Sequence, residues 1–183
     1  MKRLFGNLAD AESGPIGMEI TTVHKYGMNA LADLKPGESL LSEPMKIIQS
    51  PKVTMILYEV DNLHRQVFVD GRRFPATFEL PARLGYSIGR WEGDTFIIET
   101  RGFNEETPID GMGHPRSEAM HVTERFHRRD FGHLETGITF DDSKYYTRPF
   151  TVRIGYTLEA DNDIFEMYCD ENEKDKPHMV TNK

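Results

Sequence analysis

The chain has 183 residues, enough for one domain of ordinary size that buries a hydrophobic core without covalent staples. Thirty acidic residues against 22 basic residues give a formal net charge of −8, which argues against a nucleic-acid-binding surface. The single cysteine, Cys169, excludes an internal disulfide, and no CxxC spacing is present to bind zinc.

The N-terminus, MKRLFGNLADAESG, begins with basic residues but lacks the apolar core of a signal peptide. No apolar run elsewhere is long enough to cross a bilayer as a helix. We therefore predict a cytoplasmic protein that binds neither membrane nor nucleic acid. Homodimer formation through an outer sheet face stays open.

Short runs with strand-like alternation follow one another along the chain, separated by turn residues such as Asp70-Gly71 and Glu92-Gly93-Asp94. The segment GRWEGDTFIIET is typical of a tight hairpin. The predicted strands are Met18–Val23, Met45–Gln49, Val53–Glu59, Arg65–Asp70, Tyr86–Trp91, Thr95–Thr100, Ala119–His127, Leu134–Phe140, Phe150–Leu158 and Ile164–Cys169.

Helical periodicity is scarce, and only Tyr26–Leu34 and Phe78–Arg83 suggest a turn or two of helix. The pattern predicts an all-β fold, namely a single antiparallel barrel of the calycin or lipocalin kind with about eight to ten strands and a central cavity. A β-sandwich is the alternative. We expect residues 1–43 to form an extension with one strand and a short helix, 44–175 the barrel and 176–183 a C-terminal tail.

The stretch GMGHPRSEAMHVTERFHRRDFGHLETGITF combines strand alternation with ionisable groups. Alternate residues of a strand share a face, and two glutamates, Glu118 and Glu124, share the face of Met120, Val122 and Phe126. A carboxylate on an apolar face has lost much of its water, which suits it to proton transfer. The opposite face is predicted to be solvated and carries His121, Thr123, Arg125 and His127.

Spacing excludes two kinds of site in this stretch. Glu118 and Glu124 are six residues apart, or roughly 20 Å on a regular strand, which is too far for a glycosidase dyad. His121 and His127 cannot share a metal ion for the same reason. We therefore predict a site that contains no metal.

An arginine is predicted to enter the apolar interior from an earlier strand. Arg65 shares parity with Val67 and Val69, so it would meet a buried carboxylate there or else form a salt bridge at the rim. The carboxylate candidates are Glu59, Glu99 and Glu118.

The loop GFNEETPIDGMGHP, from Gly102 to Pro115, is too polar and too rich in glycine and proline for a core element. It is expected to cap one end of the barrel. Loops over a cavity mouth often bear function, so Asn104, Asp110 and His114 are candidate site residues.

Several motifs together resemble a large family of functionally uncharacterised bacterial proteins: PMKIIQSP, ILYEVDNLHRQVFVDGR, GYSIGRWEGDTFIIETRGFN, DGMGHPRSEAMHVTERFHRRDFGHLE and the DENEKD tail. The resemblance covers about residues 44–175. Many family members look exported and have a longer N-terminal region. The resemblance implies one coherent domain and no particular chemistry.

We expect a cofactor-independent lyase or isomerase that takes an oxygenated, largely hydrophobic small molecule into the barrel. Glu118 would act as general base or acid with His114 as its partner, while Tyr58, Arg65 or Tyr156 would hold a developing oxyanion. The residues expected to contact the ligand are Tyr156, Met120, Phe126, Asn104, Asp110 and Trp91.

The alternative is a carrier or sensor that uses the same cavity without turnover. Burial of several ionisable groups favours the enzyme, because a carrier of apolar ligands gains little from it. A glycan-acting or metal-dependent hydrolase is a weaker reading, since no GxSxG, HExxH or P-loop motif is present.

Overall fold

The computed structural model describes residues 17–23, 44–59, 62–110, 113–159 and 161–165, and of residues 17–23 it describes the backbone. This part of the chain is all-β and contains no helix, which confirms the predicted fold class. The strands are β1 (Gly17–Val23), β2 (Met45–Gln49), β3 (Val53–Tyr58), β4 (His64–Phe68), β5 (Tyr86–Glu92), β6 (Thr95–Arg101), β7 (His121–Arg128), β8 (His133–Asp141) and β9 (Phe150–Thr157).

These nine strands match predicted ones to within two residues at each end. The helix predicted at Phe78–Arg83 is wrong, because that segment consists of bends, turns and a single β-bridge. The helix predicted at Tyr26–Leu34 lies outside the described residues. Of the last predicted strand, Ile164 and Phe165 are described and belong to no strand.

The strands pair in sequence order, and all neighbouring pairs are antiparallel except β4 and β5. The sheet is therefore mixed, which corrects the fully antiparallel arrangement that we predicted. β1 pairs with β2 and also, through two residue pairs with a register shift between them, with β9.

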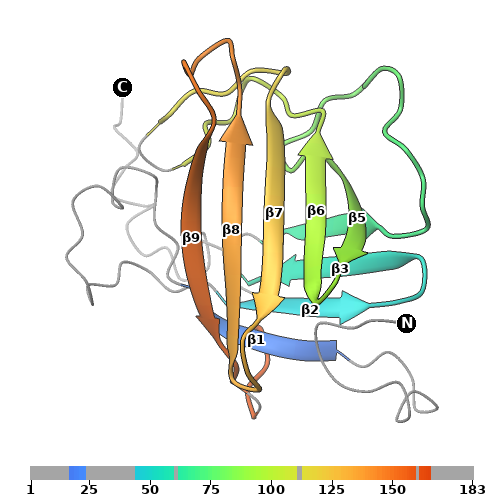
Figure 1. Cartoon of the computed structure of the whole chain (residues 1–183), viewed down its shortest axis with the longest axis vertical. Coiled ribbons are helices and arrows are strands. Elements are labelled where there is room, and N and C mark those ends of the chain that lie inside the picture. Colours follow the sequence, from blue (N-terminus) through green and yellow to red (C-terminus); the bar gives the residue numbers. More distant parts are fainter. Residues whose placement is uncertain (1–16, 24–43, 60–61, 111–112, 160, 166–183) are drawn as a thin grey trace, which may run out of the picture.

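The sheet curls strongly. Figure 1 shows β6 to β9 side by side and nearly upright, whereas β1 to β3 run across them at a steep angle. The strong right-handed twist of paired strands produces such curling. A tight turn joins β5 to β6, and its Gly93 has a φ of 58°, a left-handed conformation that glycine adopts without strain.

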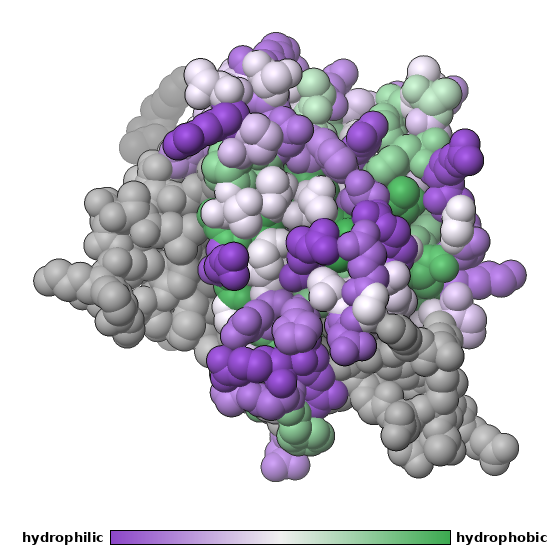
Figure 2. Space-filling view, in the orientation of Figure 1, coloured by the Kyte–Doolittle hydropathy of each residue, from purple (hydrophilic) through white to green (hydrophobic). Residues whose placement is uncertain are grey.

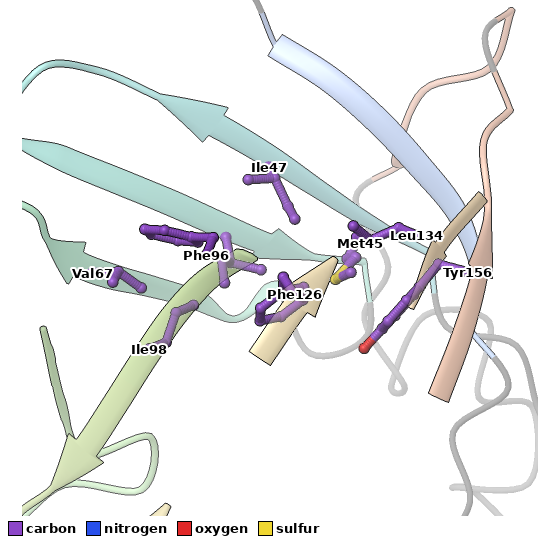
Figure 3. Packing of buried hydrophobic residues seen from close by; sticks show 9 residues of the cluster. Met45, Ile47, Val67, Phe96, Ile98, Phe126, Leu134 and Tyr156 are labelled. Carbon is purple, nitrogen blue, oxygen red and sulfur yellow. The ribbon is translucent and has the colours of Figure 1, made fainter. Parts of the chain in front are cut away.

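The main hydrophobic core lies on the concave side of the sheet. Figure 3 shows that Phe96 and Ile98 of β6 and Phe126 of β7 face Ile47 of β2 and Val67 of β4. These side chains are almost completely buried, and Phe96 is 1 % exposed. A second cluster, at the other end of β7, consists of Phe103, Met120 and Val122 with half-buried neighbours. Side chains thus occupy the interior that we had expected to hold a ligand.

The outer face of the upright strands is polar. Figure 2 shows hydrophilic and near-neutral side chains across it. Arg125 and His127 of β7 are exposed there, as predicted from parity. Salt bridges cross the strands on this face, for example from Arg125 to Glu92 at 2.9 Å.

The connection between β4 and β5, residues 69–85, packs against the end of β6. The Ala82 amide donates to the Gly102 carbonyl at 2.9 Å, and the Asn104 amide donates to the Ala82 carbonyl at 3.1 Å. Gly102 has a φ of 73°, and a Cβ there would lie 2.5 Å from the Phe78 ring. Only glycine therefore lets Phe78 lie against this strand end, where it forms one wall of the candidate site.

In the described part of the chain, no helix is long and apolar enough to cross a membrane.

Candidate functional site

A buried ion pair lies between the two hydrophobic clusters. Arg65 of β4 donates to both carboxylate oxygens of Glu124 on β7, at 3.0 and 2.5 Å. It also donates to the hydroxyls of Ser87 at 2.9 Å and Thr100 at 2.6 Å, and these hydroxyls contact each other at 2.9 Å. The side chains of Arg65 and Glu124 are each 9 % exposed. Nearly every donor of this guanidinium is occupied within the protein.

The pair corrects the predicted partner of Arg65. Arginine enters the apolar interior as expected, but its carboxylate is Glu124, not Glu59, Glu99 or Glu118. Glu124 lies between two core residues on the buried face of β7. It needs a cation there, since an unpaired buried carboxylate is costly. Glu99 instead points to the outer face and pairs with Arg90.

Electrostatics fix Arg65 as a permanent cation. Burial lowers its pKa, but attraction to Glu124 and the nearby Tyr58 hydroxyl outweighs burial, so the pKa is raised above the ordinary arginine value. A carboxylate held by two parallel hydrogen bonds to arginine is well placed to hold strands together. Because its donors are occupied, Arg65 is poorly suited to bind an oxyanion.

Tyr156, Phe126 and Trp91, which we expected to contact a ligand, pack within or against the main core. Tyr156 is 6 % exposed and stacks on Phe126 with ring centroids 6.4 Å apart. Burial, and to a smaller extent Tyr58 and Glu124, raise the Tyr156 pKa far above its ordinary value, so its hydroxyl stays protonated. Trp91 packs on Phe96 at 5.1 Å.

A pocket of about 400 Å³ lies at the rim of the sheet, where β6 and β8 end and β7 begins. We call it the rim pocket. Its volume is in the range of small-molecule sites. It is lined by four ionisable side chains, Arg101, Glu118, His121 and Asp141, and by Phe78, Ala119, Met120 and Ser143.

Strand register brings the ionisable groups together. His121 pairs with Asp141 across β7 and β8. Arg101 directly follows Thr100, the residue that pairs with Val122, and so lies beside His121 on the outer side of the sheet. Glu118 joins them from the turn before β7.

Glu118 does not point into the interior of the curled sheet, which corrects our prediction. It is exposed, because β7 begins at His121 and the preceding Glu118–Ala119 turn interrupts strand parity. The turn is held by Asp142, whose carboxylate accepts hydrogen bonds from the Ser117 amide at 2.6 Å and the Ser117 hydroxyl at 2.8 Å. Met120, Val122 and Phe126 are buried, as parity predicted.

His121 is the least ordinary ionisable group of the rim pocket. Burial lowers its pKa, and the neighbouring Arg101 lowers it further, while Glu99 and Asp141 act in the opposite direction. Its Nε2 atom lies 3.5 Å from a Glu99 oxygen and, among the described residues, makes no hydrogen bond. A neutral imidazole at neutral pH is able to accept a proton.

We expect the His121 imidazole to titrate below 6.5, the ordinary value for histidine. The folded state then binds fewer protons than the unfolded state as the pH falls through about 6.5, so stability decreases in that window. NMR titration of the imidazole and unfolding free energies at about pH 7.5 and 5 would measure both effects. In His121→Gln the decrease in stability on acidification should be smaller. An imidazole that titrates above 6.5 would contradict this expectation.

The loop before β7 contains a second histidine–carboxylate pair. His114 Nδ1 lies 2.6 Å from Asp110 Oδ2, and the Asp110 side chain is 5 % exposed. Asn104, by contrast, is engaged through its side chain and its carbonyl by Arg116, at 2.7 and 2.9 Å. The structure thus brings the predicted site residues Asp110 and His114 together, whereas the third, Asn104, holds Arg116 in place.

Sequence reasoning missed Arg101, His121 and Asp141 as pocket residues. We assigned His121 to a solvated face, and its outward direction is correct, but Phe78 and the loop ends make that corner of the sheet a pocket. Their position in the sequence could have indicated a site, because the three residues lie at strand ends next to the loops at 102–120 and 142–149.

Among the described residues, no group of three or more histidine, cysteine, aspartate or glutamate side chains is arranged to hold a metal ion.

No protein-family model matches the sequence, and no curated protein or solved structure matches it significantly. The resemblance to uncharacterised bacterial proteins therefore stays a prediction.

Proposed function

We propose that the chain is a cofactor-independent enzyme, a lyase or isomerase, that transfers protons on a small oxygenated molecule bound in the rim pocket. The observation that supports this most is the meeting of a carboxylate, a neutral imidazole and a guanidinium around one pocket. The pairing of β1 with both β2 and β9 supports a closed, calycin-like barrel as the scaffold. A cytoplasmic location stays a prediction.

Each of the three groups has its own role in the proposed reaction. Glu118 takes a proton from the carbon next to a carbonyl or carboxyl group, and Arg101 stabilises the negative charge that develops on oxygen. His121 exchanges the second proton. Return of a proton at another atom gives an isomerisation, whereas expulsion of a leaving group gives an elimination. The His114–Asp110 pair is the second candidate for the proton partner.

The rim pocket differs from the interior site that the sequence suggested. Phe78 supplies apolar surface, but most of the lining is polar, so the ligand is more polar than we first expected. The main core, meanwhile, consists of closely packed side chains around the Arg65–Glu124 pair.

The proposal is tested by proton exchange in D₂O. Phenylpyruvate and L-phenylalanine serve as probes, and NMR follows the loss of hydrogen next to the carbonyl or carboxyl group. We expect faster exchange with the protein than in buffer for at least one probe. Glu118→Gln should reduce that rate by ~10²-fold or more, the usual scale for general acid–base catalysis.

Glu106→Gln is the matched control, since Glu106 is an exposed loop glutamate that does not line the rim pocket. It should exchange at the parent rate. If Glu118→Gln also keeps the parent rate, the acid–base mechanism is wrong. Probe binding without any exchange would favour the alternative function, a carrier or sensor.

A further inference from the structure

The charges that line the rim pocket identify the kind of ligand that fits it. Arg101 is the one cation among them, and Glu118 and Asp141 are carboxylates. Among the described residues, none of these three side chains makes a hydrogen bond or salt bridge. Arg101 lies over the Phe74 ring, with its guanidinium carbon 5.2 Å from the ring centroid.

Arg101 differs from several other exposed arginines, which pair with nearby carboxylates, as Arg72 does with Asp70 and Arg90 with Glu92. The contact with the Phe74 ring positions the Arg101 guanidinium and uses none of its N–H donors. A planar fork of this kind matches a carboxylate.

The two carboxylates favour a positively charged group on the ligand. One guanidinium against two carboxylates gives the pocket a net charge of −1, with His121 neutral. A simple anion would gain from Arg101 but would be repelled by Glu118 and Asp141. A molecule with a carboxylate at one end and an ammonium group at the other satisfies both sides.

We infer that the rim pocket binds a zwitterion of the α-amino-acid class. Its carboxylate lies on Arg101, its ammonium group lies between Glu118 and Asp141, and its side chain contacts Phe78. This inference rests on the proposed function for the location of the site and adds the class of ligand.

Three matched probes test it: L-phenylalanine, N-acetyl-L-phenylalanine, which lacks the ammonium charge, and phenethylamine, which lacks the carboxylate. Binding to the full chain is measured by titration calorimetry and NMR at about pH 7. We expect L-phenylalanine to bind at least ~10-fold more tightly than either analogue, since each lost charge-assisted contact costs about that factor.

Two variants separate the two ends of the ligand. Arg101→Gln should weaken L-phenylalanine and N-acetyl-L-phenylalanine but not phenethylamine. Asp141→Asn should weaken L-phenylalanine and phenethylamine but not N-acetyl-L-phenylalanine. Arg129→Gln, an exposed arginine distant in sequence and absent from the pocket lining, is the control and should change no affinity.

Equal binding of the three probes, tighter binding of an analogue, or no binding of L-phenylalanine at millimolar concentration would overturn the inference. These outcomes differ from a failure of the proposed function. Proton exchange that depends on Glu118 would still support catalysis if L-phenylalanine did not bind, and selective binding without exchange would identify a carrier of such zwitterions.

Discussion

Glu124→Ala should lower the free energy of unfolding by about 3–5 kcal/mol, the usual cost of removing one partner of a buried ion pair. The substitution leaves Arg65 charged in the core and takes away the acceptors of two of its hydrogen bonds. An arginine side chain stays protonated in proteins, so Arg65 cannot escape this cost by losing its proton. Urea denaturation followed by fluorescence of the single tryptophan would measure the change.

Two variants control this result. Glu92→Ala removes a carboxylate that pairs with arginines on the exposed face and should cost about 0–1 kcal/mol. The double variant Arg65→Met/Glu124→Leu should be close to the parent in stability, because apolar side chains of similar size replace both charges. A loss below 1 kcal/mol in Glu124→Ala would mean that water reaches the pair.

Phe96→Ala is the second substitution with a large expected effect. The Phe96 side chain is 1 % exposed, contacts Trp91 and lies close to Gly89, so its removal leaves a cavity that the stiff sheet cannot close. We expect a loss of about 3–5 kcal/mol in the free energy of unfolding, measured by urea denaturation.

Phe131→Ala provides the comparison for Phe96→Ala. Phe131 lies in the β7–β8 turn, is 74 % exposed and contacts Arg128. Its removal should cost less than about 1 kcal/mol, since little apolar area and one exposed cation–π contact are lost. Similar losses for the two phenylalanines would show that the main core is not packed as described.

Local patterns predicted the strands well because each strand carries its own alternation and its own turn residues. The β5–β6 hairpin is an example, since Gly93 supplies the left-handed turn conformation and Phe96 and Ile98 the buried face. The parallel β4–β5 pair was not predictable in this way. It depends on how the connection 69–85 packs against Gly102 and Asn104, which is a contact between distant segments.

The candidate site was harder to predict for the same reason. Parity placed Glu124 on the core face and His121 on the outer face, both correctly. The error lay in extending the strand back through Glu118, where the Ser117–Asp142 contact imposes a turn. The partner of Arg65 was equally unpredictable, because 59 residues separate it from Glu124.

The location of the ligand is the central claim, and one NMR experiment tests it most directly. The ¹⁵N-labelled chain is titrated with the probe that shows exchange, and amide shifts are mapped onto the structure. We predict the largest shifts at Arg101, at residues 118–121 and at Asp141, with little change at Arg65 or Glu124. Shifts concentrated around Arg65, Glu124 and Tyr156 would place the ligand inside the curled sheet and contradict a rim site.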